Sequence, residues 1–244
     1  MNDFDLLKKM IYPGRFIILG QSPSGEEAVI VYSVTGRSVS SQARKIVAAD
    51  RGFWVRPTDK EILKKGRPEL LVYPAVLFAR GIAVSNGRQT EDIVRSLEKK
   101  GSAVEALVSA LLNWDYEPDS PDFTPRISGC VLLRGEAALS IIKRGEKGLE
   151  VKNYFQFSLS PGRGFLISTY TGENLEPLPS FKGEPLSLAI REKTSEAMAS
   201  SLYKALAPSR KDQDFRVSCL AIYVGLDDIN DFRAYIMNRQ ERKN

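Results

Sequence analysis

The chemistry open to this 244-residue chain is limited first by an absence, because the sequence contains no histidine. Catalytic triads that rely on an imidazole base and metal sites built from histidine are therefore excluded. The two cysteines, Cys130 and Cys219, are too few for a zinc site, and each stands in an apolar run where a free thiol usually packs as a small hydrophobe. Catalysis would have to use carboxylates, tyrosines, lysines, arginines, hydroxyls, backbone amides or a cysteine thiolate.

A loop that combines hydroxyls with cations follows the second apolar run of the chain. Its polar residues are Arg37, Ser38, Ser40, Ser41, Arg44 and Lys45, with Gly36 as the turn residue. Backbone amides and hydroxyls can surround phosphate oxygens, and an arginine adds a permanently charged fork. The segment is typical of an anion-binding loop, and an ordinary surface turn is the alternative.

A second polar loop runs over residues 115–127 and is rich in carboxylates, prolines and aromatic rings. It contains Glu117 and, near its end, Arg126. A carboxylate held beside hydrophobic rings has a raised pKa, and a neighbouring arginine lowers that pKa again, which is how a site tunes an acid or a base. Glu117 is therefore a candidate for proton transfer, with a purely structural loop as the alternative.

Two shorter motifs, Tyr73-Pro74 and Asn86-Gly87, stand beside predicted elements. Proline cannot donate a hydrogen bond to a strand ladder, so the strand holding Tyr73 should lie at an edge or be locally irregular. Asn86-Gly87 precedes a helical pattern and is typical of a turn and cap, although anionic ligands also bind at such positions. The structural alternatives are a core tyrosine and a plain turn.

The elements that must position these residues follow an order of strands, two helices, strands, one long helix and a final strand. Apolar β-branched runs predict strands over residues 15–20, 28–34, 52–56, 70–78, 82–85, 127–133, 139–143, 151–158, 165–170 and 215–224. Helical spacing predicts helices near 93–97, 104–112 and 194–206, with Gly101 as a break. This order lacks the alternation of a parallel doubly wound sheet and predicts an α+β fold.

The sequence also allows predictions for the segments between and after these elements. The first two strands are separated by a turn-rich segment and should form an antiparallel hairpin. The glycine-rich pieces at 145–148 and 162–164 lack a nucleotide-binding fingerprint and are interpreted as hairpin turns. Residues after Val224 are expected to form a polar tail that contains a short helix.

Length, composition and charge set the broad class. A hydrophobic fraction of 43% and a charged fraction of 27% favour one folded domain over residues 1–244. No apolar run approaches the roughly 20 residues that span a bilayer, and the acidic start lacks a signal peptide's basic residues, so we expect a cytoplasmic protein without a membrane partner. A net charge of +5 suits an anionic ligand such as a nucleotide, without the dense basic stripe of a nucleic-acid-binding protein.

Several motifs in one order then make a stronger pattern than any of them alone. They are Tyr12-Pro13-Gly14-Arg15, Gly36-Arg37-Ser38, Tyr73-Pro74, Val84-Ser85-Asn86-Gly87 and Tyr116-Glu117-Pro118-Asp119, followed by Thr169-Tyr170-Thr171-Gly172. Together they resemble the IMP cyclohydrolase family typified by the archaeal enzyme, from residue 12 to about residue 185. The resemblance implies a four-layer α-β-β-α sandwich like that of N-terminal nucleophile hydrolases. The chain begins Met1-Asn2, so N-terminal nucleophile chemistry is not implied.

The resemblance also implies a reaction and a site. In that reaction the carboxamide nitrogen of FAICAR attacks its formyl carbon, and water leaves to give IMP in de novo purine biosynthesis. The reaction needs no metal or redox cofactor, and the family precedent favours a homo-oligomer. The catalytic residues carried over are Arg37 for substrate orientation or oxyanion charge, Tyr73 for a hydrogen bond to the formyl or carboxamide group, and Glu117 for proton transfer. The substrate-binding residues carried over are Ser38, Arg44, Asn86, Gly87 and Arg126.

Three other interpretations stay open at this stage. A non-catalytic purine-nucleotide-binding or regulatory protein could keep the pocket and lose the chemistry. An amide or peptide hydrolase of the same fold would need a nucleophile, for which Cys130 in its apolar strand is a poor candidate. A nucleic-acid-binding protein is favoured only by the pI near 9.1. The motif also departs from the bacterial-type pattern at Arg88, where an acidic residue is expected.

Overall fold

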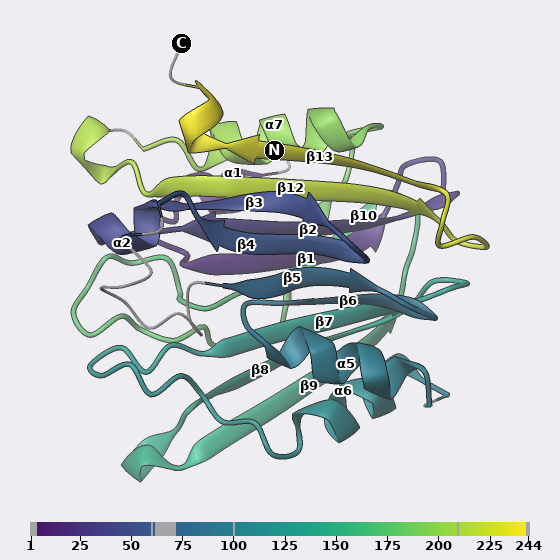
Figure 1. Cartoon of the computed structure of the whole chain (residues 1–244), viewed down its shortest axis with the longest axis horizontal. Helices are drawn as coiled ribbons and strands as arrows, with labels where there is room; N and C mark the ends of the chain where they lie inside the picture. Colours follow the sequence, from purple (N-terminus) through teal and green to yellow (C-terminus); the bar gives the residue numbers. More distant parts are fainter. Residues whose placement is uncertain (1–3, 60, 62–71, 100, 209, 243–244) are drawn as a thin grey trace.

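The computed structural model describes residues 4–59, 61, 72–99, 101–208 and 210–242. Across these residues the chain has an α+β structure with two antiparallel sheets and few helices, as the element order predicts (Figure 1). The start of the strand predicted over 70–78 and the Met1-Asn2 start lie outside the described residues.

Six described strands form the first sheet, in the order β11-β10-β1-β2-β12-β13. Their bounds are β1 Arg15–Gln21, β2 Glu27–Thr35, β10 Arg163–Ser168, β11 Leu186–Ala189, β12 Arg216–Gly225 and β13 Phe232–Asn238. β1 and β2 pair antiparallel at the centre, with Ile18 opposite Val31, so the predicted hairpin is confirmed. Every residue of β1 is buried, because both faces of this strand are covered.

Seven described strands form the second sheet, in sequence order from β3 to β9. Their bounds are β3 Arg44–Ala49, β4 Gly52–Pro57, β5 Tyr73–Phe78, β6 Gly81–Ser85, β7 Arg126–Leu132, β8 Glu136–Arg144 and β9 Glu150–Ser158. β5 is the third strand, not an edge, and its pairing with β4 shifts register where Trp54 lies opposite Pro74. The local irregularity predicted for Tyr73-Pro74 is therefore confirmed, because the ladder bypasses the missing N–H of Pro74.

Helices α1, α7, α5 and α6 pack on the outer sides of the sheets, whereas the short α2 lies at one end of them (Figure 1). Their bounds are α1 Asp5–Lys8, α2 Val39–Gln42, α5 Gln89–Leu97, α6 Ala103–Leu111 and α7 Ser195–Ala205. Short 3-10 turns cover Glu146–Gly148, Lys211–Gln213 and Arg239–Arg242. α1 and α7 share an apolar cluster with the six-stranded sheet, whereas α5 and α6 share one with the seven-stranded sheet.

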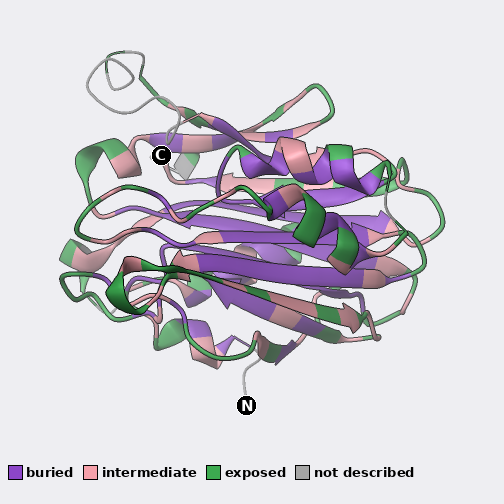
Figure 2. Ribbon diagram, turned by 90° about the horizontal axis from the view of Figure 1, so that it is seen from below, coloured by how far each residue is buried: buried purple, intermediate pink, exposed green. Residues whose placement is uncertain are grey.

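A third and larger apolar cluster fills the space between the two sheets. Along β1, Ile17 and Leu19 belong to this inner cluster, whereas Phe16 and Ile18 face α7. This division follows from the period of two in a strand, which sends successive side chains to opposite faces. Figure 2 shows the same result as continuous buried strands with exposed residues on the outer helices and loops. Cys130 and Cys219 are both fully buried, so their predicted packing role is confirmed.

Four details of the sequence interpretation need correction. The predicted polar tail contains the strand β13 before its 3-10 turn, and β13 pairs with β12. The strand β3 was not predicted because it is short and begins with two charged residues. The strand β11 was not predicted because it is short and follows a proline-rich segment. Residues 145–148 do join a β8–β9 hairpin, but Gly162 lies between β9 and β10, which belong to different sheets, and Gly164 is already part of β10. The second turn is therefore a crossover and not a hairpin.

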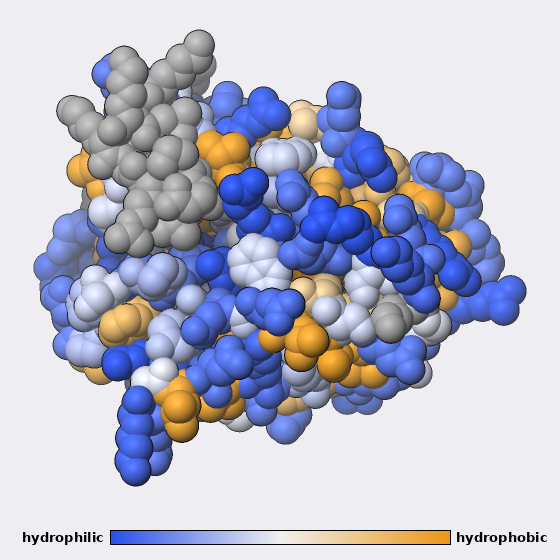
Figure 3. Space-filling model, turned by 60° about the horizontal axis from the view of Figure 1, so that its bottom comes forward, coloured by the Kyte–Doolittle hydropathy of each residue, from blue (hydrophilic) through white to orange (hydrophobic). Residues whose placement is uncertain are grey.

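The outer surface carries no sign of a bilayer-spanning helix. None of the helices in the described ranges has the length and apolar content needed to cross a membrane. The face drawn in Figure 3 is mostly hydrophilic, with apolar residues in small groups between charged ones.

The two sheets bring distant motifs to one end of the molecule. β1, β5 and β7 begin at this end, and β2 and β6 finish there, because neighbouring strands run antiparallel. Arg15, Tyr73 and Arg126 are the first residues of their strands, and Ser85 is the last residue of β6. Motifs separated by more than 100 residues in sequence therefore meet in one region.

Candidate active site

A pocket of about 300 Å³ opens at this end of the sheets. Its wall contains four of the predicted site residues, namely Arg37, Ser38, Arg44 and Glu117. It also contains Ser40 and Ser41 of the predicted anion-binding loop. The other lining residues were not predicted for the site and are Tyr12, Arg15, Asp119, Asp122, Thr124, Tyr170 and Leu178. The predicted residues Tyr73, Asn86, Gly87 and Arg126 lie next to this wall but do not line it.

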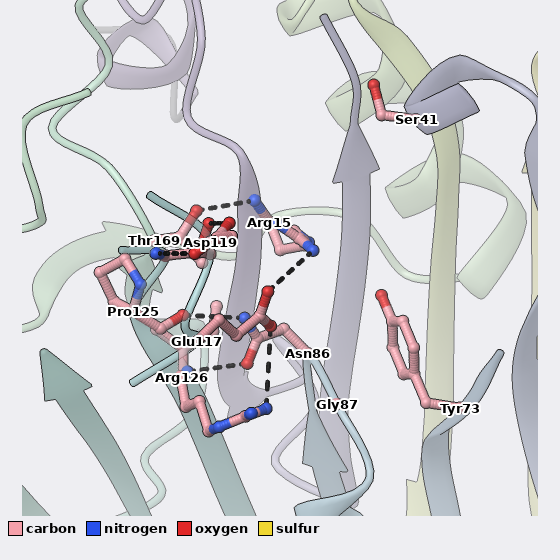
Figure 4. Close-up of polar contacts among 12 residues, drawn as sticks. Arg15, Ser41, Tyr73, Asn86, Gly87, Glu117, Asp119, Pro125, Arg126 and Thr169 are labelled. Carbon is pink, nitrogen blue, oxygen red and sulfur yellow. Dashed lines mark hydrogen bonds and ion pairs between the residues drawn. The ribbon is translucent and has the colours of Figure 1, made fainter. Parts of the chain in front are cut away.

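Glu117 is the most deeply buried acid of the pocket, with 2% of its surface exposed. Its carboxylate lies between two arginines, 3.9 Å from Arg15 Nη2 and 3.8 Å from Arg126 Nη1 (Figure 4). Within the described part of the chain no hydrogen bond reaches this carboxylate, since both distances are too long for one. Burial raises the pKa of Glu117, and the charges of Arg15 and Arg126 offset part of that rise.

The loop predicted to tune Glu117 holds that residue through its backbone. The Glu117 N–H donates to the carbonyl of Thr124 at 2.9 Å, which closes the loop upon itself. Asp119 accepts from both the N–H and the hydroxyl of Thr124, and the Thr124 hydroxyl lies 2.7 Å from the Tyr170 hydroxyl. The proline-rich segment therefore keeps a defined shape without a helix or strand, and it presents Glu117 to the pocket together with Asp119 and Asp122.

Arg126 is fixed by contacts on the side away from the pocket. Its Nε donates to the Asp115 carbonyl at 2.7 Å, and its guanidinium carbon lies 4.9 Å from the centre of the Trp114 ring. A guanidinium that stacks on an aromatic ring and bonds a carbonyl has little rotational freedom. Arg126 therefore supplies a fixed positive charge beside Glu117.

Asn86 and Gly87 lie in the turn next to the pocket and do not line its wall. The Asn86 amide donates to the Pro125 carbonyl at 2.9 Å, and its oxygen accepts from the Ile127 N–H at 2.9 Å. A Cβ on Gly87 would lie 2.9 Å from Arg126 Nη1, so a larger residue would displace that arginine. Both predicted substrate-binding residues thus position Arg126 and the start of β7.

The predicted anion-binding loop forms the mouth of the pocket. Ser38 caps the short α2, accepting from the Ser41 N–H at 3.1 Å, while the Ser41 hydroxyl accepts from the Ser38 N–H at 2.9 Å. Arg37 donates to Asp122 at 3.0 Å and to the Leu175 carbonyl at 3.2 Å, so it ties three loops together. Arg44 is 3% exposed and its Nε donates to the Ser41 carbonyl at 2.8 Å.

Tyr73 is buried beside the pocket and forms a pair with a second tyrosine. Its hydroxyl lies 2.8 Å from the hydroxyl of Tyr32, which comes from β2 in the other sheet. Burial raises the pKa of Tyr32 well above its usual range, and the neighbouring Tyr73 adds to the rise. Figure 4 shows the Tyr73 hydroxyl directed to the same side of the site as the Arg15 guanidinium. Tyr32 therefore stays protonated and can donate to the Tyr73 hydroxyl.

Comparison with known proteins identifies the family. Residues 12–228 match the family described as IMP cyclohydrolase-like protein, which covers most of the chain. The chain belongs to the IMP cyclohydrolase-like family. It is 30% identical over 161 residues to the IMP cyclohydrolase of Methanosphaera stadtmanae, covering 66% of this chain and 74% of that protein.

Two further relatives carry the same name. The IMP cyclohydrolase of Methanopyrus kandleri is 31% identical over 166 residues, which cover 68% of this chain and 78% of that protein. The IMP cyclohydrolase of Halobacterium salinarum is 35% identical over 135 residues, which cover 54% of this chain and 63% of that protein. The resemblance inferred from the ordered motifs is therefore confirmed at the level of the family.

Arg15 lines the pocket of this IMP cyclohydrolase-like chain but was not predicted as a site residue. It was part of the first motif, and its position as the first residue of β1 after Gly14 was the available signal. Gly14 has a φ of +75°, and a Cβ there would lie 2.0 Å from the Thr169 hydroxyl, so only glycine allows this close turn. The turn brings the Arg15 N–H to the Thr169 hydroxyl at 3.1 Å and starts β1 at the pocket.

The pocket of this IMP cyclohydrolase-like chain is also a site of paired charges. Arg15, Arg37 and Arg44 line it together with Glu117, Asp119 and Asp122. Among the described residues, no group of three or more cysteine or acidic side chains is arranged to hold a metal ion. The arrangement can bind a ligand with an anionic end and move a proton at one buried carboxylate.

Proposed function

We propose that this chain is an IMP cyclohydrolase, which closes the purine ring of FAICAR to give IMP and water in de novo purine biosynthesis. Its curated relatives carry that name, and its family is described as IMP cyclohydrolase-like. The observation that carries the proposal is Glu117, a buried carboxylate with a raised pKa that lines a pocket rich in arginines. A base of this kind is what an amide nucleophile requires.

The reaction can be balanced with one proton-carrying group. The carboxamide nitrogen attacks the formyl carbon, a C–N bond forms, and the formyl C=O electrons move to oxygen. Glu117 takes one amide proton and returns it to that oxygen, which gives a ring hydroxyl. In the second step Glu117 takes the proton from the former formamide nitrogen and gives it to the departing hydroxyl, so that water leaves and the C=N bond of IMP forms.

The remaining predicted residues take roles that fit their positions. Tyr73 donates a hydrogen bond to the formyl or carboxamide oxygen, and its Tyr32 partner at 2.8 Å orients its hydroxyl. Arg37, Ser38 and Arg44 at the pocket mouth receive the phosphate end of the nucleotide, because they combine fixed charge with hydroxyls. Asn86, Gly87 and Arg126 act on the carboxylate side, where they hold Glu117 in its buried position.

The wider properties of the enzyme are also proposed. The described elements support a four-layer α-β-β-α sandwich resembling the N-terminal nucleophile hydrolases, since helices pack on both outer sheet faces around a shared inner cluster. We propose a single domain over residues 1–244, a cytoplasmic location, a homo-oligomer, and activity without metal or redox cofactor. The partner is a purine nucleotide and not a nucleic acid or membrane.

An amide hydrolase of similar fold is disfavoured by the thiols. Cys130 and Cys219 are fully buried, and burial raises the pKa of both thiols, that of Cys219 to about 12. A thiol with a raised pKa that no ligand can reach is a poor nucleophile. The pocket residues therefore favour proton transfer over covalent catalysis.

The test is ring closure of FAICAR by the purified chain, with IMP measured by chromatography. The wild-type chain should form IMP well above the uncatalysed rate. Glu117→Gln should lower kcat by about 10²- to 10⁴-fold, the usual contribution of a general acid or base. Arg37→Ala should raise KM about tenfold or more, the loss expected for a charge-assisted contact.

A matched control and a contrary outcome complete this test. Glu136 stands at the opposite end of its sheet, where it accepts from the Ala103 N–H at 2.6 Å, so Glu136→Gln should leave kcat within about twofold of wild type. Tight IMP binding without FAICAR turnover by the wild-type chain would instead mark a non-catalytic nucleotide-binding protein.

A further inference from the structure

Among the arginines in and around the pocket, Arg15 alone has a buried side-chain nitrogen with no hydrogen-bond partner among the described residues. It is 9% exposed, and its Nε is a buried donor for which the described residues provide no hydrogen-bond acceptor. Its Nη2 lies 3.9 Å from Glu117, beyond hydrogen-bonding distance. A guanidinium has five N–H donors and cannot lose its charge in a protein, so leaving them unpaired is costly.

The other arginines in and around the pocket each use part of their guanidinium to hold neighbouring loops. Arg37 donates to Asp122 and to two groups on the 174–175 loop. Arg44 donates to the carbonyls of Ser41 and Thr35. Arg126 donates to Asp115 and Gln89 and stacks on Trp114, and it does not line the pocket. Arg15 is thus the pocket-lining arginine with a buried donor that no described residue pairs, which points to a ligand as its partner.

The neighbours of Arg15 define which part of a ligand it would meet. Its charge interacts with Glu117 on one side and with the hydroxyls of Tyr73 and Tyr32 on the other. Figure 4 places the Arg15 guanidinium directly beside the Glu117 carboxylate, deep in the site and away from Ser41 at the mouth. A group bound by Arg15 would therefore be the group whose proton Glu117 moves.

We propose that Arg15 is a catalytic residue, whose guanidinium binds the formyl oxygen of the substrate and stabilises the negative charge that develops there during ring closure. This proposal rests on the proposed function and moves the oxyanion role from Arg37, at the mouth, to Arg15. The charge appears when the carboxamide nitrogen adds to the formyl carbon and the C=O electrons move to oxygen. Donors fixed beforehand in a buried site stabilise such charge most effectively.

The experiment compares Arg15→Met and Arg15→Lys with wild type, using FAICAR turnover for kcat and KM and calorimetry for IMP binding. Removing one such donor lowers kcat by about 10²- to 10³-fold, and we expect this for Arg15→Met with IMP affinity changed less than about tenfold. Arg15→Lys keeps the charge without the fork and should give an intermediate kcat. In a third variant, Arg15→Ala, added guanidinium ion should take the place of the missing side chain and restore part of the activity.

The matched control is Arg233→Met, which removes an arginine that pairs with Glu27 at the start of β2, the end opposite the pocket, and should leave kcat within about twofold of wild type. A folded Arg15→Met variant with kcat within about threefold of wild type would overturn the proposal. So would recovery of its kcat at higher pH, because Arg15 would then act only by lowering the Glu117 pKa.

Two further outcomes keep the test decisive. If Arg15→Met does not fold, the folded Arg15→Lys variant decides, since a kcat equal to wild type overturns the proposal and a drop of about tenfold or more supports it. If the wild-type chain itself has no FAICAR turnover, the proposed function fails. If the wild type turns over and the Arg15 variants do too, only the role of Arg15 fails.

Discussion

Two arginine–carboxylate pairs in this molecule differ in geometry and therefore in what they can do. The first pair lies at the start of β12. There Arg216 donates two hydrogen bonds, of 2.8 and 2.7 Å, to the Asp214 carboxylate and a third, of 3.1 Å, to the Tyr203 carbonyl. In the second, in the pocket, Arg15 and Glu117 face each other at 3.9 Å without a hydrogen bond. The first pair is closed, and the second leaves room for a ligand atom between its charges.

The pKa values of the two carboxyls follow this difference. Burial works against the charge of Asp214, but the hydrogen bonds and charge of Arg216 outweigh burial and lower the pKa of Asp214 below its usual value. For Glu117 burial dominates, and the more distant Arg15 and Arg126 offset only part of it, so its pKa is raised. A well-made ion pair removes a carboxylate from proton chemistry, whereas an open pair keeps it available.

The largest effect expected from the closed pair is on stability. Asp214→Asn removes the charge that accepts two hydrogen bonds and should reduce the free energy of unfolding by about 2 kcal/mol, within the range for hydrogen bonds to charged groups. For a chain of this size that corresponds to a fall in Tm of about 4 to 8 °C. Thermal unfolding followed by circular dichroism would measure it.

The same variant should leave catalysis unchanged, with kcat within about twofold of wild type, because Asp214 does not line the pocket. Glu117→Gln should show the reverse pattern, a large loss of kcat with little loss of Tm. Equal effects of the two variants on kcat and on Tm would remove the distinction between a closed and an open pair.

A smaller effect is expected where the open pair meets the two tyrosines. Tyr32→Phe removes the hydroxyl that lies 2.8 Å from the Tyr73 hydroxyl, so Tyr73 loses the partner that orients its proton. One net hydrogen bond is worth about 1 kcal/mol, which predicts a kcat lower by about 3- to 10-fold with KM little changed. Steady-state kinetics with FAICAR would measure this change.

Tyr223→Phe is the matched control for Tyr32→Phe. Tyr223 is also fully buried on the six-stranded sheet, but its hydroxyl donates to the Glu192 carbonyl at 2.7 Å, in the cluster under α7. We expect its removal to lower Tm and leave kcat unchanged. A Tyr32→Phe variant with wild-type kcat would mean that Tyr73 needs no partner, or has no role in the reaction.

Much of the fold could be predicted because the strongest patterns in the sequence are local. The alternation along β1 and β2 and the helical spacing in α5 and α6 depend only on nearby residues. β3 and β13 were missed because each is an edge strand that is only partly buried, and neither has the regular alternation of apolar and polar residues that marks a strand. Whether Gly162 turns back on the same sheet or crosses to the other is decided by the packing of the two sheets, which no local pattern reports.

The site was predictable in its residue types but not in its pairings. The sequence pointed to Glu117 as a tuned carboxylate, and its loop indeed lies beside an arginine at Arg126. The second arginine, Arg15, is 102 residues earlier in the chain and reaches Glu117 only because β1 and the 115–127 loop meet at one end of the sheets. Spacing in a sequence carries no signal for such a contact.

The smallest effect expected from the comparison is a pH dependence of stability with opposite signs in the two pairs. A protonated Glu117 contributes stability that is fully present below the unfolded pKa of 4.5 and is lost as pH rises through its higher folded pKa. Glu117→Gln stays neutral and keeps that contribution, so its free energy of unfolding minus that of wild type should grow as pH rises above 4.5.

Asp214 provides the opposite case, because its folded pKa lies below the ordinary value of 3.8. The stability contributed by its charged form is present above 3.8 and is lost as pH falls through the folded pKa, so the deficit of Asp214→Asn against wild type should shrink at acid pH. Urea unfolding of both variants and wild type from pH 3 to pH 8 would measure the two slopes. A Glu117→Gln difference that stays flat across this range would mean that Arg15 and Arg126 fully balance the burial of Glu117, and the open pair would then be no better poised for proton transfer than the closed one.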